Sequence, residues 1–411
     1  MASGFDMTSF AAALKKRYAR DYVESMAYKD APLFAMVEKN EDFGGEKWVQ
    51  PVMYEDVQAR SALFSQAQTL STTEESKIKA FEVTRVKDYG VITIDGELIE
   101  ASKKNEDAFW RGVTTKIDSI MRATALSAKI SLYRKGWGAI GQVSSPSAST
   151  TLTLKNPEDV VNFAEGQVLV FAASEDADAL RDSGDDLVVT GVNRSAGTLT
   201  VAENVTTVSG ITDGDYIFVK GDREDSATPV RRKIAGLEDW CPQTAPGSTT
   251  FFGVNRTADT RLGGCRLDAT SPVLNLEEAL IEGATLVHRE GGNPDYCFMN
   301  PKKVGDLIKL LGSKVNYVDV KTGNVGFRAL EVHLPTGSVK VVADRFCPVN
   351  RAFLVQMDTW FLGSLGAVPR ILNHDGLESL RQASDDGIEI RVGYYANLVC
   401  KAPGWNCNIK I

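Results

Sequence analysis

Three histidines are the first side chains to consider, because imidazole serves both as a metal ligand and as a catalytic base. His288 falls in a predicted helix, His333 in a predicted hairpin strand and His374 in a predicted loop. A metal triad would need them to converge, and no spacing in the sequence indicates that they do. The sequence also has no GxSxG, HExxH or Walker pattern. We therefore expect a protein that is not an enzyme and that carries no cofactor.

The six cysteines are the other residues that could bind a metal or react. They form no CxxC pair, so the sequence does not predict a zinc site. In a reducing compartment we expect buried or inert thiols. The six are Cys241, Cys265, Cys297, Cys347, Cys400 and Cys407.

Two lysines follow an Asn-Pro pair in "CFMNPKKVGDLIKLL", residues 297–311. Cations at a helix start could mark an anion site. However, no Gly-rich loop precedes them, and Asn300 followed by Pro301 is a typical N-cap and first helical residue. We therefore favour a capped helix without a ligand. Asn275 and Glu278 likewise predict a capping box for "LEEALIEGATLVHRE".

Acidic residues are concentrated in one segment. Residues 144–226 hold fifteen Asp and Glu against five Lys and Arg, whereas the rest of the chain holds 39 against 41. The run "SEDADALRDSGDD" lacks the spacing and the glycine of a calcium-binding EF-hand loop, so a solvated loop is favoured. Short apolar runs separated by Asn-Arg-Ser-Ala-Gly and Asp-Gly turns predict a small β barrel or sandwich inserted into a larger domain.

Long extended elements precede this insert. "KIKAFEVTRVKDYGVITID", residues 77–95, is rich in β-branched and aromatic residues. As one strand it would span roughly 60 Å, far more than the usual strand of about six residues. Paired with "EKWVQPVMYEDV", it predicts an arm that projects from the body. Residues 103–135 then carry apolar residues at spacings of three and four, which predicts a helix of roughly 45 Å.

The remaining segments predict the body. "DYCFM" reads as a buried strand, and "ALEVHLPTGSVKVVAD" as a hairpin around Pro-Thr-Gly. Further strands are predicted in "AFLVQMDTWFLGSLGAVPRIL" and "GIEIRVGYYANLVCKAPGWNCNIKI". Together with the helices they indicate a mixed α+β class. All apolar runs are shorter than a membrane span, and the amino terminus has its apolar patch before its basic residues, the reverse of a secretory signal.

The order of these parts resembles the Hong Kong 97-type major capsid protein fold of tailed phages. "DYCFMNPKKVGDLIKLL" resembles the strand, Asn-Pro and helix unit of that family's axial domain. "DTWFLGSLGAVPRIL" and "IRVGYYANLVCKAPGWNCNIKI" are similar to its return and closing strands, and "GVNRTADTRLGG" to another recurring segment. The resemblance implies the following division: N-terminal arm 1–45, extended-loop hairpin 46–96, spine helix 97–143, inserted acidic β domain 144–226, return to the peripheral domain 227–269, axial domain 270–370, and closing peripheral strands 371–411.

The resemblance also implies a function and partners. The chain would assemble with itself into hexamers and pentamers of an icosahedral shell that encloses double-stranded DNA, in the virion, after assembly in the host cytoplasm. A portal and a decoration protein are further partners that it suggests. No scaffolding domain precedes residue 10, so a separate scaffolding protein is expected. The alternatives are an encapsulin-like compartment shell and, from another class, a soluble hydrolase with an accessory β module.

Subunit contacts are predicted for two groups of residues. A projecting hairpin cannot cover its apolar side chains within one subunit, so neighbouring copies should cover them. These are Leu63, Phe64, Leu70, Phe81 and Val83. Arg17 and Arg20 belong to a basic turn near the amino terminus. That turn is either a solvated helix face, which is favoured, or an arm that grips a neighbour or an acidic partner.

Overall fold

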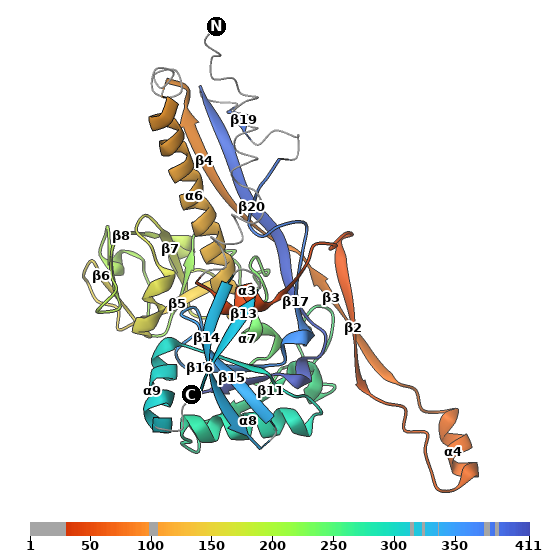
Figure 1. Cartoon of the computed structure of the whole chain (residues 1–411). Helices are drawn as coiled ribbons and strands as arrows, with labels where there is room; N and C mark the ends of the chain where they lie inside the picture. The colour runs from red at the N-terminus through yellow and green to blue at the C-terminus, as the bar shows by residue number, and fades with distance from the viewer. Residues whose placement is uncertain are drawn as a thin grey trace.

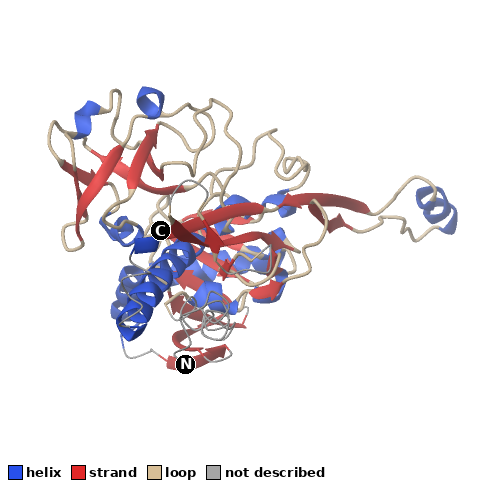
Figure 2. Ribbon diagram, turned by 90° about the horizontal axis from the view of Figure 1, so that it is seen from above, coloured by secondary structure: helices blue, strands red, loops and turns tan. Residues whose placement is uncertain are grey.

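The structure, a computed structural model, describes residues 30–97, 106–312, 316–322, 325–335, 337–373, 379–382 and 386–411. It contains two sheets, a small closed barrel and one long two-stranded ribbon that projects from the rest (Figure 1, Figure 2). The predicted α+β class is therefore confirmed. Arg17, Arg20 and His374 lie outside the described residues. No helix in the described part of the chain is both long and apolar enough to cross a membrane.

The projecting ribbon pairs β2 (Lys47–Glu55) with β3 (Lys77–Thr84) in antiparallel register, from Lys47 opposite Thr84 to Met53 opposite Ile78. At its tip the chain forms the short helix α4 (Phe64–Ser71). Figure 1 shows this ribbon leaving the body and ending at α4, with no other element beside its tip. We call residues 47–84 the hairpin arm.

The prediction of one nineteen-residue strand over 77–95 is wrong. The strand is interrupted at Arg85, and β4 (Val86–Asp95) pairs with β20 (Gly387–Cys400) instead of continuing the ribbon. The Arg85 guanidinium lies 5.0 Å from the centre of the Phe43 ring and donates to the Phe43 carbonyl oxygen. This local anchor ends the ribbon, so the arm is shorter than the predicted 46–96.

The first sheet lies beside the long helix α6 (Glu106–Ser131). Ile117 and Met121 of the helix pack on Ile94 of β4 and on Ile390 of β20. Gly90 permits this contact, because a Cβ there would lie 2.5 Å from Ile120. The other strands of this sheet are β1 (Glu38–Asn40), β17 (Trp360–Ser364), β18 (Arg370–Ile371) and β19 (Leu380–Arg381); the short helix α3 (Pro32–Met36) precedes β1.

The second sheet has seven strands and is covered by the helices α8 (Leu276–Arg289) and α9 (Pro301–Leu311). Its order is β11 (Cys265–Asp268), β21 (Cys407–Lys410), β16 (Arg351–Val355), β12 (Tyr296–Met299), β15 (Gly337–Ala343), β14 (Val325–Leu334) and β13 (Asn316–Thr322). The predicted hairpin around Pro335 is β14–β15.

Two predicted boundaries in the body do not follow the sheets. The last strand, β21, belongs to the second sheet, because it pairs with β16 and its Ile409 packs beneath Gly283 of α8. Conversely, β17 lies within the predicted axial segment 270–370 but pairs with β20 in the first sheet. Near the carboxyl terminus the chain therefore passes from one sheet to the other and back. The predicted segments 270–370 and 371–411 each contribute strands to both sheets.

Both predicted helix caps are present. The Asn300 side chain accepts a hydrogen bond from the Lys302 amide at 3.1 Å, and Pro301 is the first helical residue. The Asn275 amide donates to Glu278 at 2.8 Å. Instead of facing a helix-end anion, the Lys302 ammonium lies 2.8 Å from Glu158 in the insert. The capped-helix interpretation is confirmed.

The insert is a closed barrel of six strands in the order β10-β5-β6-β9-β8-β7. Its first strand begins five residues before the predicted boundary at 144, because Ala139–Gln142 pair with β10. Alternate residues such as Leu152, Val189 and Leu199 fill its centre. The strands are β5 (Ala139–Ser144), β6 (Thr151–Leu154), β7 (Val168–Ala172), β8 (Leu187–Asn193), β9 (Thr198–Val201) and β10 (Tyr216–Val219).

The chain enters the barrel through "GWGAIG", residues 136–141, which has the glycine spacing of a dinucleotide-binding loop. That motif requires a strand before it and a helix after it. Here α6 precedes the run and β5 follows it. The glycines instead allow close packing, since a Cβ on Gly136 would lie 2.9 Å from the Lys233 carbonyl oxygen. The spacing is therefore coincidental.

Five of the cysteines are buried and Cys265 is half-buried, and none forms a disulfide. Burial raises the pKa of the Cys241 thiol to about 12 and that of Cys265 to about 11. These thiols stay protonated near neutral pH, which suits inert residues. His288 and His333 are both exposed, and no cluster of three His, Cys, Asp or Glu residues is present in the described ranges.

Asp344 is a buried carboxylate that joins three parts of the body. It accepts hydrogen bonds from the Tyr133 hydroxyl at 2.8 Å, from the Phe346 amide at 3.0 Å and from the Leu33 amide at 3.4 Å. Burial raises the pKa of Asp344 to about 6 in spite of these donors. Between about pH 4 and pH 6 the folded protein thus holds a proton that the unfolded chain releases.

This shift predicts that the contribution of Asp344 to stability falls as pH rises through that window. In Asp344→Asn the group cannot titrate. We expect the unfolding free energy of the wild type, relative to the variant, to drop by roughly 1–3 kcal/mol between about pH 4.5 and pH 7. Urea unfolding at both pH values measures the difference, and an unchanged difference would contradict the prediction.

Candidate assembly arm and its anchor

The hairpin arm has two faces, because side chains alternate along paired strands. Near its root, one face packs on the body. Trp48 of β2 lies edge-on to Phe43 at 5.8 Å and to Phe361 at 5.3 Å between ring centres. Phe81 of β3 lies 5.1 Å from Trp240. The root of the arm is therefore part of the core.

This burial corrects two predicted subunit contacts. Phe81 and Val83 are both 0% exposed within one copy of the chain, so no neighbour is needed to cover them. Their cover comes from Trp240 and Phe251, which lie more than 150 residues further along the chain. Alternation places them on the inner face, whereas the apolar residues that need cover lie on the other face.

The outer face of the arm is apolar and open. Val49 is 59% exposed, Met53 58% and Ile78 52%, and Met53 stands directly opposite Ile78 across the two strands. Pro51 and Ala80, the next exposed pair, extend the same face. Ion pairs of Lys47 with Glu82 and of Lys77 with Glu55 flank it, and such exposed pairs add little to stability. The sequence did not reveal this stripe, because the register of the two strands decides which side chains share a face.

At the tip, α4 contributes further apolar surface. Leu63 is 64% exposed and Phe64 82%, while Leu70 is half-buried. No residue of α4 is buried. A helix of eight residues with no buried side chain gains almost nothing from packing in the isolated chain. The predicted contacts Leu63, Phe64 and Leu70 thus lie together at the tip, separate from the inner-face pair.

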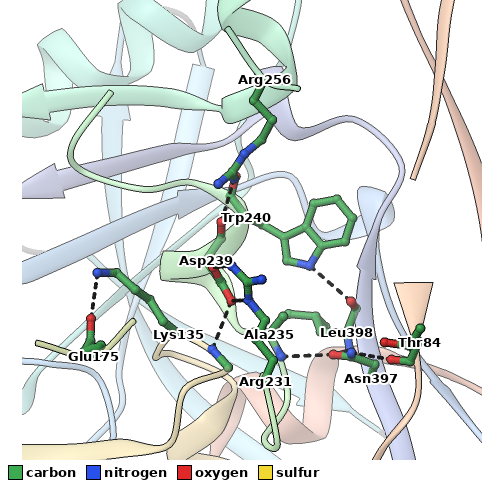
Figure 3. Close-up of polar contacts among 11 residues, drawn as sticks. Thr84, Lys135, Glu175, Arg231, Ala235, Asp239, Trp240, Arg256, Asn397 and Leu398 are labelled. Carbon is green, nitrogen blue, oxygen red and sulfur yellow. Dashed lines mark hydrogen bonds and ion pairs between the residues drawn. The ribbon is translucent and has the colours of Figure 1, made fainter. Parts of the chain in front are cut away.

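Asn397 of β20 anchors the base of the arm (Figure 3). Its Oδ1 accepts a hydrogen bond from the Ala235 amide at 3.0 Å, and its Nδ2 donates to the Thr84 carbonyl oxygen at 2.7 Å. Thr84 is the last residue of β3. One buried side chain therefore links the arm, the return segment after the barrel, and the longest strand of the first sheet.

The helix α7 (Leu237–Trp240) completes the anchor. The Trp240 indole donates to the Leu398 carbonyl oxygen at 3.1 Å, as Figure 3 shows. Arg256 donates to the carbonyl oxygens of Asp239, at 2.7 Å, and of Trp240, at 3.2 Å. Burial lowers the pKa of Arg256 to about 10, but the guanidinium remains charged at neutral pH. These charged donors hold the short helix in place.

The Asp239 carboxylate connects this anchor to the barrel entrance. It accepts from the Arg231 guanidinium at 2.9 Å and from the Gly136 amide at 3.0 Å (Figure 3). Arg231 also covers the ring of Trp137 at 4.3 Å. No local pattern in the sequence marks Asp239, Arg256 or Asn397, because each acts on residues that are distant in the chain.

Residues 211–386 match the family model of the SU10 major capsid protein. The whole chain is similar in fold to the capsid of cyanophage A-1(L), with 11% identity, 92% of each chain covered and a TM-score of 0.48. It is similar to Mycobacterium phage Ogopogo, with 8% identity, 93% of this chain and 92% of that chain covered and a TM-score of 0.42. An encapsulin complex of Synechococcus elongatus is similar at 8% identity, over 97% and 94% of the chains, with a TM-score of 0.43. No curated protein matches the chain.

The matched family segment runs from just before the last barrel strand to just after β19, and it includes α7, α8, α9 and all strands of the second sheet except β21. It contains three of the four segments quoted above for the resemblance, and the projecting arm and the long helix stand before it in the predicted order. Over residues 211–386 the chain is therefore similar to a family of major capsid proteins.

Proposed function

We propose that copies of this chain assemble into the hexamers and pentamers of an icosahedral shell that encloses double-stranded DNA. The observation that carries the proposal is the open outer face of the hairpin arm. Val49, Met53 and Ile78 are each more than half exposed on a ribbon that extends away from the body. Burial against a neighbouring copy is the simplest way to remove this apolar surface from water.

A closed shell makes such contacts effective. One arm offers only a narrow stripe, so a single contact is expected to be weak. In a closed assembly each subunit gives one arm and receives another, and many simultaneous contacts give high avidity. We also propose a domain for each sheet. The first sheet with α6 would form the peripheral domain, and the second sheet with α8 and α9 would form the axial domain.

The balance of acidic and basic residues supports a shell that encloses DNA without recognising its sequence. Outside the insert, acidic and basic residues nearly balance, at 39 against 41. DNA carries one negative charge per about 1.7 Å of its axis, and strong binding would need a basic stripe. The acidic barrel would be repelled by packaged DNA, so the proposal places it on the outer surface. A separate scaffolding protein, a portal, and a decoration protein remain proposed partners, with assembly in the host cytoplasm.

Expression of the full chain, alone and together with the scaffolding candidate from the same genome, tests the proposal. Electron microscopy and analytical ultracentrifugation should show megadalton shells in at least one of these conditions. A stable monomer or small oligomer in both would overturn it. Shells that co-purify with an enclosed protein cargo and that package no DNA would instead indicate the encapsulin-like alternative.

A further inference from the structure

The inserted barrel is joined to the body by a narrow neck of two adjacent chain segments. The Lys233 amide donates to the Gly136 carbonyl oxygen at 3.1 Å, and the Gly236 amide donates to that of Arg134 at 3.0 Å. A Cβ on Gly236 would collide with the backbone of Leu132. The chain therefore enters and leaves the barrel at one place, as a hinge requires.

Ion pairs bridge the barrel and the body at the neck and beside it, and in each of them the carboxylate belongs to the barrel side. The cations come from the end of α6, from the first turn of α9 and from the return segment. The four pairs within 3 Å are Arg134–Asp159 at 2.6 Å, Lys135–Glu175 at 2.7 Å, Lys233–Asp222 at 2.9 Å and Lys302–Glu158 at 2.8 Å, and Arg232–Glu224 at 3.7 Å has the same polarity. Part of the barrel's excess of acidic residues therefore serves to pair with cations of the body.

The interface between these pairs is not closely packed. A cavity of about 480 Å³ separates the barrel from α6, between side chains such as Leu126 and Ile130 on the helix and Ile140 on the barrel. The buried Asn162 lines this cavity, and its Oδ1 has no hydrogen-bond partner. A second, polar cavity of about 210 Å³ contains Arg134, whose buried Nε also lacks a partner. Both cavities are clefts open to solvent, so the barrel and the body are not closely packed against each other on these sides.

We propose that the barrel is a hinged module, held against the body by its charge pairs and able to swing about the neck while both parts stay folded. The neck supplies the pivot, the four pairs supply the attraction, and the two open clefts leave room for the motion. This property belongs to the single chain, so it holds whether or not the chain forms the proposed shell.

The groups around the carboxylates decide which change weakens the pairs. Burial raises the pKa of Asp159 and of Glu175, and it raises the pKa of Asp222 to about 6. A carboxylate with a raised pKa holds its proton more tightly than a solvated carboxylate does, so these shifts alone do not predict release of the barrel in mild acid. Removing the facing cations is the change that weakens the pairs. The facing groups are Arg134, Lys135, Tyr216 and Glu238 around Asp159 and Glu175, and Asp88, Arg232, Lys233 and Tyr394 around Asp222.

Hydrogen–deuterium exchange of the full-length chain tests the hinge. In the double variant Lys135→Met, Lys302→Glu we expect exchange at the neck amides of Lys233 and Gly236 to rise about tenfold, together with amides on the cavity side of α6. Amides within the barrel strands and α8 should keep their wild-type rates. Lys309→Glu is the matched control, because Lys309 pairs with Asp306 inside α9 and not across the interface.

A salt series on the wild type gives an independent measurement if the double variant does not fold. Raising NaCl from about 0.05 M to about 1 M weakens the exposed and half-exposed pairs and should raise neck exchange at least about threefold. Unchanged neck exchange in this series, or a rise that is equal throughout the chain, would overturn the proposal. So would a Lys309→Glu control that opens the neck as much as the double variant.

Discussion

Replacing Val49, Met53 and Ile78 together by threonine is expected to abolish shell assembly while the protein stays folded. These side chains form the outer face of the arm and are more than half exposed, so the protomer loses little when they become polar. An assembly contact would lose about 1 kcal/mol for each, on the usual scale of apolar burial. Because every subunit carries the change, the loss is repeated at every contact of the shell. We expect the yield of particles to fall at least about tenfold.

Analytical ultracentrifugation gives the particle yield, and circular dichroism with a thermal melt checks the fold. Val273→Thr is the matched control, since Val273 is 87% exposed but lies on the body, before α8. The control should assemble as the wild type does. Normal shells from the triple variant would show that the outer face of the arm is not the contact that holds them together.

Local signals in the sequence were enough for several elements. Asn300 and Pro301 determine the start of α9 through their own backbone geometry, and the capping box at Asn275 acts within one turn. The long helix and the barrel were predictable for a similar reason, because their apolar periods and turn residues are continuous along the chain. Elements of this kind depend little on distant partners.

The errors arose where a distant residue decides the outcome. The end of the ribbon at Arg85 depends on Phe43, and the burial of Phe81 depends on Trp240. The place of β21 depends on its pairing with β16. In each case the segment has a suitable pattern for a strand, but the pattern does not say which partner the strand or side chain takes. Leu63 and Phe64 at the tip have no distant partner within the chain that would decide their burial. They remain predicted assembly contacts.

Asn397→Leu is expected to destabilise the folded chain strongly, although the side chain keeps the same number and branching of heavy atoms. Asn397 is 1% exposed, and its amide group bonds to the Ala235 amide and the Thr84 carbonyl oxygen. Leucine would leave the buried Ala235 amide without this partner, at a cost of about 1–3 kcal/mol, and would remove the part-buried bond to the Thr84 carbonyl oxygen, at about 0.5–1.5 kcal/mol. We therefore expect the unfolding free energy to fall by roughly 1.5–4.5 kcal/mol in urea unfolding. Because Thr84 ends the arm, hydrogen exchange along β3 should rise as well.

Asn408→Leu separates this effect from the general cost of altering a buried asparagine. Asn408 is 0% exposed, but it makes one side-chain hydrogen bond, to the Cys241 carbonyl oxygen at 2.8 Å, and its Oδ1 already lacks a partner. Its replacement should cost less than half as much and should leave exchange along β3 unchanged. Equal losses in the two variants would mean that Asn397 is an ordinary core residue. A selective loss at Asn397 would mean that one amide holds the arm in the direction from which it can reach a neighbour.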